Sequence, residues 1–364
     1  MTALLILAIT LSACGAGSRS QTTPVATPGG VRPASLLLSP TPTPQPVVFP
    51  RDEAPHHDLT EWWYYTGHLA TKDGRQFGFE FVIFQGLRGT LPPAYAAHFA
   101  ITDIAAGSFH YAERTATIAT PPFGTVPFTL DLGGWKLTDS GADATINASM
   151  PGYQLSLKLH SVKPPALHNT VGYFDFAPGM GSYYYSRTRI KAGGSLSVAG
   201  KPLRVSGTAW MDHQWGNFLT GSGGWDWFSI QLSDNQELML WHSRDPKNRV
   251  TYGEGTEVAP SGRTTAIRGT GFSITATGSW TSPHSGATYP SGWTVEVPSG
   301  RIHLTLTPVL KDQELMTPKS TGVTYWEGDV AIKGTIRGQP VSGQGYVELT
   351  GYAPPEKSAT PVIP

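Results

Sequence analysis

Short segments in which apolar and polar residues alternate recur from about residue 60 to about residue 350. Alternation with a period of two is typical of strands that bury one face, and turn-forming residues separate the segments. No segment keeps the period of a helix for longer than about two turns. We therefore expect strands over 77–84, 98–103, 128–138, 144–150, 153–160, 183–190, 203–210, 225–232, 237–242, 250–258, 265–277, 292–297, 302–308, 324–333 and 341–350. Strands at this spacing predict an all-β sandwich or barrel.

The connecting segments indicate how the strands are grouped. Lys72-Asp73-Gly74-Arg75 and Gly193-Gly194 are typical of tight turns, and 161–182 reads as a long loop because it is rich in proline and glycine. The chain has 364 residues, which suits two domains of moderate size. The loop at 217–224 is the economical boundary, so we predict an N-terminal β domain over 55–218 and a C-terminal β domain over 224–353.

The first residues resemble a bacterial lipoprotein signal. Leu4 to Leu11 is apolar but too short to span a bilayer, and it leads into Leu11-Ser12-Ala13-Cys14. We therefore expect residues 1–14 to be a signal whose Cys14 is lipidated, and the protein to be extracytoplasmic and membrane-anchored, with simple secretion as the alternative. No Lys or Arg precedes the apolar run, so either the true start lies upstream of Met1 or the signal is weak. Residues 15–54 are rich in Pro, Thr and Ser, which predicts a disordered tether.

Charge and composition exclude some classes of protein and of binding site. Lys plus Arg and Asp plus Glu both number 26, so no net field would attract nucleic acid, and we expect no nucleic-acid partner. Charged residues make up 14% of the chain, beside 42 glycines and 11 tryptophans, as in an all-β protein with many turns and an aromatic interior. Cys14 is the one cysteine, which excludes a disulfide framework and a cysteine metal site.

The strongest candidate for chemistry is the segment 207–216, GTAWMDHQWG. Side chains two apart on a strand share a face. That places Trp210, Asp212 and Gln214 on one face, and Met211, His213 and Trp215 on the other. A carboxyl group beside an indole has a raised pKa, which is how a general acid is made at neutral pH. The alternative is that Asp212 caps the turn at Gly216-Asn217 and that the tryptophans are core.

A second carboxyl group, Glu80, lies among phenylalanines and shares a face with Val82 and Phe84. Because an unpaired buried carboxylate is costly, we expect Glu80 to form a structural ion pair with an arginine such as Arg187 or Arg189. The alternative is that Glu80 has a function of its own.

Two other kinds of catalytic site are not supported by residue spacing. His56, His57, Glu61 and His68 do not match a helical His-x-x-x-His pattern, so we predict no metal site. A serine hydrolase would need Gly-x-Ser-x-Gly on a strand-to-helix turn, and no such motif occurs.

Three segments together resemble one family: EWWYYTGHL at 61–69, GSYYYSRTRI at 181–190, and GTAWMDHQWG at 207–216 followed by GWDWFSIQL at 224–232. They are similar to the AttH-type secreted proteins, which share a lipocalin-like fold with the carotenoid 1,2-hydratases. The resemblance covers about 55–350. It implies two lipocalin-like, calycin-type antiparallel β-barrels packed together, with a ligand site in or between them. Asp212 matches the aspartate proposed as the acid of those hydratases. AttH-type proteins also resemble partners of ABC exporters.

These observations leave three functional hypotheses. The first is a hydro-lyase: cofactor-independent, acid-catalysed hydration, or related hydrolase or cyclase chemistry, on an apolar isoprenoid- or lipid-like substrate. Its acid would be Asp212, and the pocket would be lined by Trp62, Tyr64, Tyr184, Trp210 and Gln214. The second is a carrier that presents an apolar ligand to an ABC transporter. The third is a structural protein of the cell surface. A protonated Asp212 distinguishes the first from the second, and the lack of a ligand-sized cavity would favour the third.

Overall fold

The computed structural model describes residues 44–89, 91–177, 180–218 and 223–354. These residues are nearly all in strands, turns and loops, which confirms the predicted all-β class. The helices among them are three-residue 3-10 turns at Arg51–Glu53, Gly269–Gly271 and Pro298–Gly300. In this part of the chain no helix has both the length and the apolar character needed to cross a membrane. The predicted signal 1–14, with Cys14, lies outside the described residues.

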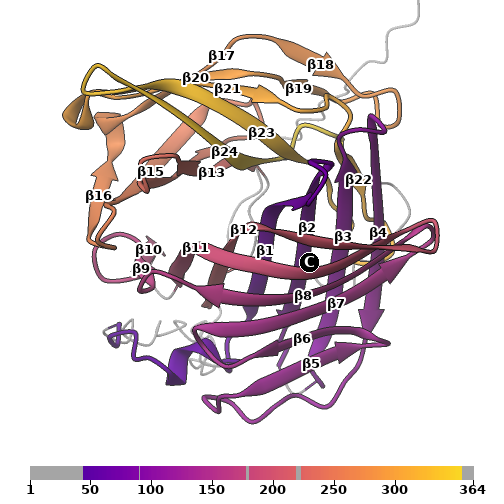
Figure 1. Cartoon of the computed structure of the whole chain (residues 1–364). Coiled ribbons are helices and arrows are strands. Elements are labelled where there is room, and N and C mark those ends of the chain that lie inside the picture. Colours follow the sequence, from indigo (N-terminus) through magenta and orange to yellow (C-terminus); the bar gives the residue numbers. More distant parts are fainter. Residues whose placement is uncertain (1–43, 90, 178–179, 219–222, 355–364) are drawn as a thin grey trace, which may run out of the picture. The chain divides into compact units, whose positions relative to one another are not determined.

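The first half of the chain forms a large antiparallel sheet, sheet A, drawn in indigo to pink in Figure 1. Its strands follow the order β4-β3-β2-β1-β12-β11-β8-β7-β6-β5, and β9 and β10 also pair with β11. The strands are β1 (Thr60–Thr71), β2 (Gln76–Gly86), β3 (Ala94–Asp103), β4 (Ser108–Ala116), β5 (Phe128–Leu132), β6 (Trp135–Asp139), β7 (Asp143–Met150), β8 (Tyr153–Ser161), β9 (Ala166–Leu167), β10 (Tyr173–Ala177), β11 (Met180–Val198) and β12 (Lys201–Gly216).

The second half forms sheet B, drawn from salmon through orange to yellow, in the order β16-β15-β14-β13-β24-β23-β21-β20-β17, with β22 on β23. Its strands are β13 (Gly224–Leu232), β14 (Glu237–Arg244), β15 (Val250–Val258), β16 (Thr264–Arg268), β17 (Ser273–Ala276), β20 (Trp293–Val297), β21 (Ile302–Pro308), β22 (Glu314–Met316), β23 (Thr324–Ile336) and β24 (Gln339–Thr350). A separate pair joins β18 (Ser279–Thr281) and β19 (Thr288–Pro290).

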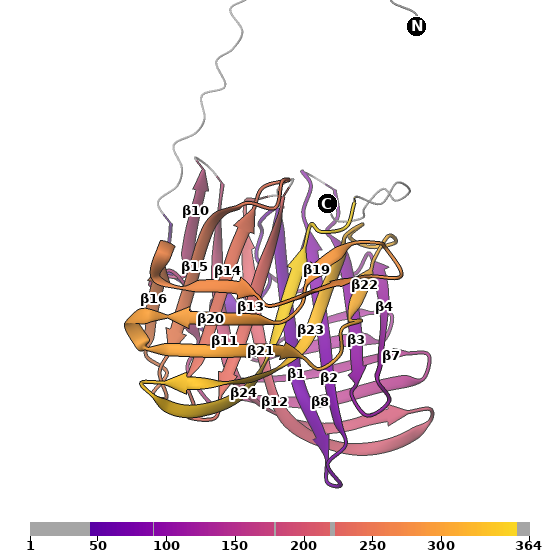
Figure 2. The same cartoon turned by 90° about the horizontal axis from the view of Figure 1, so that it is seen from above.

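Sheet A curls until its two edge strands meet. The Arg114 guanidinium on β4 lies 4.7 Å from the Trp135 ring centroid, and its Nη1 donates a 3.2 Å hydrogen bond to the Leu132 carbonyl at the end of β5. Sheet A is therefore a nearly closed barrel, and sheet B is a half-barrel packed against it. In the view of Figure 2, β20 and β21 run across the direction of β1 and β2. The prediction of two packed lipocalin-like barrels is confirmed.

Alternation along the strands builds two separate cores. On β1, Trp63 and Tyr65 point into the sheet A barrel and are almost fully buried there. On β13, Phe228 and Ile230 are buried in the concave core of sheet B. The other face of these strands is turned toward the opposite sheet, since side chains two apart on a strand share a face.

The contact between the sheets is rich in buried polar groups. Lys163 Nζ lies 2.7 Å from Glu237 Oε2, and Gln231 Nε2 donates to the Thr188 carbonyl at 2.8 Å. Buried polar groups of this kind are stable only when they are paired. The sheets are thus held in one relative register, and any site between them is positioned by both.

The structure changes several predicted elements. The expected strand at 128–138 is a β5–β6 hairpin, because Gly133 and Gly134 turn the chain with φ of 62° and 93°. The expected strand at 265–277 is interrupted by the 3-10 turn at Gly269–Gly271. The expected loop at 161–182 contains β9 and β10, and β4, β18, β19 and β22 were not predicted.

The predicted Gly193-Gly194 turn lies instead inside β11. A Cβ atom on Gly194 would lie 2.0 Å from the Ser156 carbonyl oxygen on β8. The glycine here permits close approach of two paired strands, which is a use that the sequence does not distinguish from a turn.

Residues 44–54 of the predicted tether belong to the described structure. Asp52, Glu53 and Ala54 are buried, and Glu53 accepts hydrogen bonds from Tyr185 and Arg187 of sheet A. At the other predicted boundary, the chain leaves sheet A at Gly216 and enters sheet B at Gly224. Whether the two sheets are separate domains remains a prediction.

Candidate functional site

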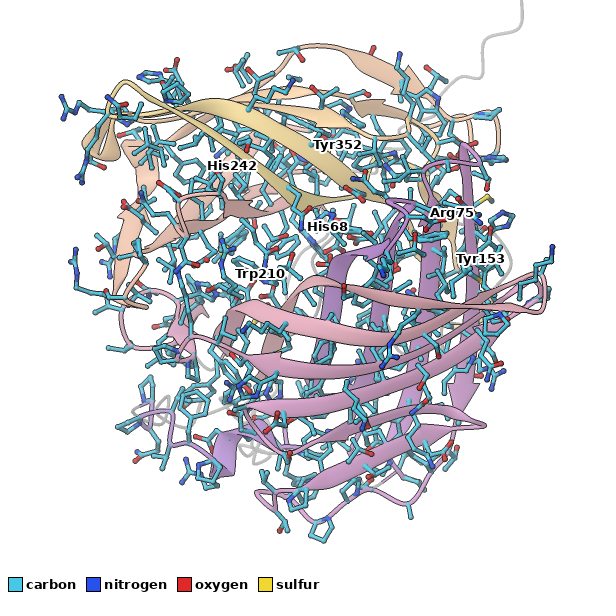
Figure 3. The ribbon with its side chains drawn as sticks, viewed as in Figure 1. His68, Arg75, Tyr153, Trp210, His242 and Tyr352 are labelled. Carbon is cyan, nitrogen blue, oxygen red and sulfur yellow. The ribbon has the colours of Figure 1, made fainter. Side chains whose placement is uncertain are left out.

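A cavity of about 330 Å³ lies between sheet A and sheet B, outside both barrel cores. Most of its wall is apolar and aromatic, as in sites for small apolar ligands. Figure 3 labels Trp210 at this level, between the two sheets. The lining residues are Thr60, Trp62, Tyr64, Glu80, Val82, Phe84, His98, Phe174, Phe176, Met180, Tyr184, Asp212, Gln214 and Phe218 from the first half of the chain, and Trp225, Trp227, Trp241, Ser243, Thr321, Val323, Tyr325, Glu348 and Thr350 from the second.

The period of the strands explains which residues reach the cavity. Asp212 and Gln214 on β12 both line it, as the alternating pattern predicted. His213, between them, points into the sheet A barrel, where its ring stacks 4.9 Å from that of Trp63. The prediction that His213 and Asp212 occupy opposite faces is therefore confirmed.

Asp212 is 3% exposed and bonded by three donors. Tyr184 Oη donates to Oδ2 at 2.6 Å, Trp210 Nε1 donates to Oδ1 at 2.6 Å, and the Ser186 hydroxyl donates to Oδ1. Burial raises the pKa of Asp212 to about 7, although these three hydrogen bonds act to lower it. Because Asp212 lies inside β12 and bonds side chains, the turn-cap alternative is wrong.

The two arginines at the centre of β11 form ion pairs with other carboxylates and not with Asp212. Arg187 pairs with Glu53, and Arg189 pairs with Glu237. In the described part of the chain no Lys or Arg forms an ion pair with Asp212. Asp212 can thus hold a proton near neutral pH, since no cation stabilises its charged form.

The other predicted pocket residues divide into two groups. Trp62, Tyr64, Tyr184 and Gln214 line the cavity. Trp210 is buried beside the cavity and does not line it. Its indole nitrogen donates a hydrogen bond to Asp212, which does line the cavity. Its ring packs edge-on against that of Trp227 at 6.2 Å, so it connects Asp212 to sheet B.

The expected ion pair of Glu80 is wrong. Glu80 is 1% exposed and lines the cavity, and Tyr325 Oη lies 2.9 Å from its Oε1. No described Lys or Arg pairs with it, because β2 presents Glu80 toward sheet B while Arg187 and Arg189 are held by other carboxylates. Burial raises the pKa of Glu80 to about 8.

Two further carboxyl groups surround the cavity. Glu348 lines it, and removal from bulk water raises its pKa to about 7. Glu327 is fully buried and accepts a 2.7 Å hydrogen bond from Tyr64 Oη, and its pKa lies well above the ordinary value because of burial and the nearby Glu80. None of these four carboxyl groups is paired with a Lys or Arg in the part of the chain that the structure describes. Four such groups in one apolar site cannot all be charged, so the site holds protons at neutral pH.

The histidine-rich N-terminal residues assemble away from this cavity. Glu61 Oε1 lies 2.8 Å from His56 Nδ1 and 2.8 Å from His213 Nε2, and the three side chains are close enough to be considered for a metal. The rings already bond the carboxylate directly, however. Burial acts to raise the pKa of Glu61, but its pairing with His56 and His213 outweighs burial and leaves this pKa lowered. The Nδ1 atom of His68 lies 3.2 Å from Oδ1 of Asp329 instead.

Most lining residues from sheet B were not predicted. The segment GWDWF carries Trp225 and Trp227 two positions apart, so one shared face of β13 was readable from the sequence. The sequence did not show which strands of sheet A this face contacts, because packing between the two sheets leaves no local pattern in the sequence. His98 and Tyr325, which meet across the sheets at 2.7 Å, were missed for that reason.

The chain is similar to a known protein family and to solved structures. The model of the AttH-like family matches residues 40–352. The crystal structure of an AttH-type protein from Nitrosomonas europaea is 29% identical, with a TM-score of 0.77, and covers 86% of this chain and 100% of that chain. The crystal structure of kievitone hydratase from Nectria haematococca is 21% identical, with a TM-score of 0.68, and covers 84% and 93%. At that identity the likeness shows a shared fold.

A curated relative also matches by sequence. Kievitone hydratase from Fusarium solani subsp. phaseoli is 26% identical over 193 residues, which are 49% of this chain and 51% of the relative. The chain thus matches about half the length of this relative.

Proposed function

The chain belongs to the AttH-like family, and we propose that it adds water to an alkene of an apolar, isoprenoid- or lipid-like substrate by acid catalysis. Similarity to kievitone hydratase over half of the chain supports hydration as the reaction type. The aromatic cavity between the sheets supports an apolar substrate. This chemistry needs an acid, a cation-stabilising surface and a water molecule, and no redox cofactor.

The observation that carries this proposal is the environment of Asp212. The carboxyl group faces an aromatic cavity, has no cationic partner among the described residues, and has a pKa of about 7. A general acid works best when its pKa lies near the working pH. Asp212 protonates one alkene carbon, and the adjacent carbon becomes a tertiary cation.

The walls of the cavity suit that cation. Aromatic faces attract positive charge, and Trp62, Tyr64 and Trp227 contribute rings on two sides. The Tyr64 and Trp227 rings are arranged edge-to-face at 5.3 Å, which fixes their orientation. Water then attacks the cation, and the product is an alcohol.

A second candidate function is a carrier that delivers an apolar ligand to an ABC transporter. It is favoured by the size and apolar lining of the cavity, which a carrier needs as much as an enzyme does. In either case we propose an extracytoplasmic location with a lipid anchor at Cys14. A carrier has no use for a proton on Asp212, whereas the hydratase depends on it.

Two experiments test the proposal. Mass spectrometry of apolar compounds that copurify with the protein identifies the ligand class. In the kievitone assay, purified protein is incubated with kievitone and the product is examined for the mass of one added water. We expect Asp212→Asn to bind ligand nearly as wild type does and to lose about 100-fold or more of turnover.

The matched control is Asp139→Asn. Asp139 is also a buried aspartate, and burial raises its pKa to about 7. It bonds Tyr65, however, and lies outside the cavity. Full turnover in Asp212→Asn would rule out the acid role. Equal losses in both variants would mean that folding, rather than chemistry, was affected.

A further inference from the structure

Glu80 has one bonded and one free carboxyl oxygen. Oε1 lies 2.9 Å from Tyr325 Oη, while Oε2 is buried and has no hydrogen-bond partner among the described residues. A buried, unpaired carboxyl oxygen is costly, and such atoms are often completed by a ligand or by water. Since Glu80 lines the cavity, Oε2 is suited to bond a molecule held there.

From Oε1 a continuous series of hydrogen bonds leads away from the cavity. Tyr325 Oη lies 2.7 Å from His98 Nδ1, His98 Nε2 lies 2.9 Å from Ser320 Oγ, and Ser320 Oγ lies 2.5 Å from Glu113 Oε2. The residues come from β2, β23, β3, the loop after β22, and β4, so the series crosses the contact between the sheets. Ser320 is fully buried, whereas Glu113 on the edge strand is partly exposed.

Counting hydrogens along this series fixes where the proton of Glu80 lies. Glu113 accepts two bonds from the Lys319 backbone N–H and one from the Ser320 hydroxyl, so it is an acceptor only. Ser320 must then accept from His98 Nε2–H. Burial lowers the pKa of His98 to about 3, so its ring is neutral and Nδ1 is an acceptor.

The remaining hydrogens follow from that ring. Because Nδ1 of His98 is an acceptor, the Tyr325 hydroxyl donates its one hydrogen to Nδ1. A charged Glu80 would accept from Tyr325 at 2.9 Å; on this hydrogen count the direction is reversed, and a proton on Glu80 Oε1 makes the contact. The free Oε2 is consequently the carbonyl oxygen of a neutral carboxyl group, which can accept a proton while Oε1 releases one.

We propose that Glu80 is a second catalytic residue, which takes a proton from the adding water at Oε2 and passes one from Oε1 through Tyr325, His98 and Ser320 to Glu113. This inference rests on the proposed hydration. As the C–O bond forms, one O–H bond of the water breaks and its proton goes to Oε2. Each intermediate group gains one proton and loses one, and Glu113 gains one.

The proton count of the cycle is balanced. Asp212 gives one proton to the alkene carbon, the proton that left the water stays on Glu80 Oε2, and Glu113 finally holds the proton that Ser320 passes on. Solvent takes the proton from Glu113 and returns one to Asp212, so the net reaction is alkene plus water to alcohol. Before the next turnover the hydroxyl hydrogens of Glu80, Tyr325 and Ser320 reorient, and His98 returns to its Nε2–H tautomer. Asp212 and Glu80 lie on β12 and β2 with β1 between them. Strand spacing and rise put their Cα atoms roughly 12 Å apart, which leaves room for the reacting carbons and one water.

The role of the series is tested by variants that leave the cavity wall intact. Ser320→Ala removes the hydroxyl that connects His98 to Glu113. Thr102→Val is the matched control, because Thr102 is also a buried hydroxyl between the sheets, bonded to Gln313 at 2.8 Å, but outside the series. In the kievitone assay we expect Ser320→Ala to lower kcat with little change in KM, and Thr102→Val to turn over as wild type does.

Glu113→Ala distinguishes a role in proton transfer from a purely structural role. We expect its kcat to fall and to recover as formate is added, because formate can occupy the space of the lost carboxylate. Glu80→Gln keeps the shape but cannot exchange protons, so we expect a loss of about 100-fold or more that formate does not restore. No formate effect on Glu113→Ala, or equal kcat in Ser320→Ala and Thr102→Val, would overturn the relay.

One measurement is independent of activity. Nitrogen-15 NMR of histidine-labelled protein should show His98 at neutral pH as a neutral ring with its proton on Nε2. A proton on Nδ1, or a doubly protonated ring, would overturn the hydrogen count. Failure of the proposed hydration is seen differently, as a wild-type protein that forms no water adduct, so the two failures are distinguishable.

Discussion

The Tyr184 hydroxyl donates a 2.6 Å hydrogen bond to Oδ2 of Asp212. The same hydroxyl oxygen accepts a 2.9 Å bond from the indole nitrogen of Trp227, which belongs to sheet B. Asp212 and Tyr184 belong to neighbouring strands of sheet A, so the carboxyl group is held from both sides of the cavity. The site is therefore complete only when the two sheets are packed together.

Tyr184→Phe tests how this hydrogen bond controls Asp212. Loss of a donor to the charged form raises the pKa of the carboxyl group by about one unit. Turnover needs protonated Asp212 and falls as pH rises through about 7. We therefore expect this fall in the pH–rate profile of Tyr184→Phe to occur at a higher pH, by about one unit. Tyr65→Phe, which removes a matching bond to Asp139, is the control and should leave the pH of this fall unchanged. An unchanged profile in Tyr184→Phe would show that Asp212 is not the group that titrates.

Adjacent tryptophans on β1 should separate stability from binding. Trp63 is fully buried in the sheet A core, and truncating such a residue costs about 3–5 kcal/mol. Trp62 faces the cavity. We expect Trp63→Ala to lower the melting temperature strongly, and Trp62→Ala to weaken ligand binding with a smaller change in melting temperature. Thermal unfolding and ligand titration of both variants check this, and the reverse pattern would place the wrong face of β1 in the core.

Glu80 makes the stability of the protein depend on pH. Its pKa rises from 4.5 in the unfolded chain to about 8 in the fold, so the folded state holds an extra proton between those values. Its contribution to stability is thus present below pH 4.5 and is lost as pH rises through about 8. We expect the free energy of unfolding of wild type, relative to Glu80→Gln, to fall by up to about 1.4 kcal/mol per pH unit in this window. Urea unfolding at several pH values measures the difference. A constant difference would mean that Glu80 is charged in the fold.

The face of Asp212 could be predicted because β12 is regular around it and alternation needs only local sequence. Its bonding partners could not, since Tyr184, Ser186 and Trp227 come from other strands. The fold class followed from strand spacing, and the resemblance supplied the two packed barrels. Neither indicated that the cavity lies between the barrels rather than inside one.

Glu80 shows where local reasoning fails. A buried carboxylate does favour an arginine partner, and two arginines occur in GSYYYSRTRI. The pairing of β11 is irregular between Arg187 and Ile190, and the arginines bond Glu53 and Glu237, which are distant in the sequence. Glu80 remains neutral instead, a solution that depends on the hydrogens of Tyr325 and His98 across the contact between the sheets.

The proposed anchor is tested apart from the fold. Cys14→Ser removes the thiol that would carry the lipid, so we expect the variant to move from the membrane fraction to the soluble fraction. Fractionation followed by immunodetection measures this, with wild type as the reference. Unchanged membrane association in the variant would contradict lipidation at Cys14.

Carbon-13 NMR of aspartate-labelled protein tests the central claim most directly, because it reads the protonation of Asp212 without a substrate. The Asp212 signal is identified by its loss in Asp212→Asn, and its position is followed from pH 4 to pH 9. We predict a titration midpoint near 7, which leaves a proton available at neutral pH. A midpoint near the ordinary aspartate value of about 3.9 would contradict the acid role and favour the carrier.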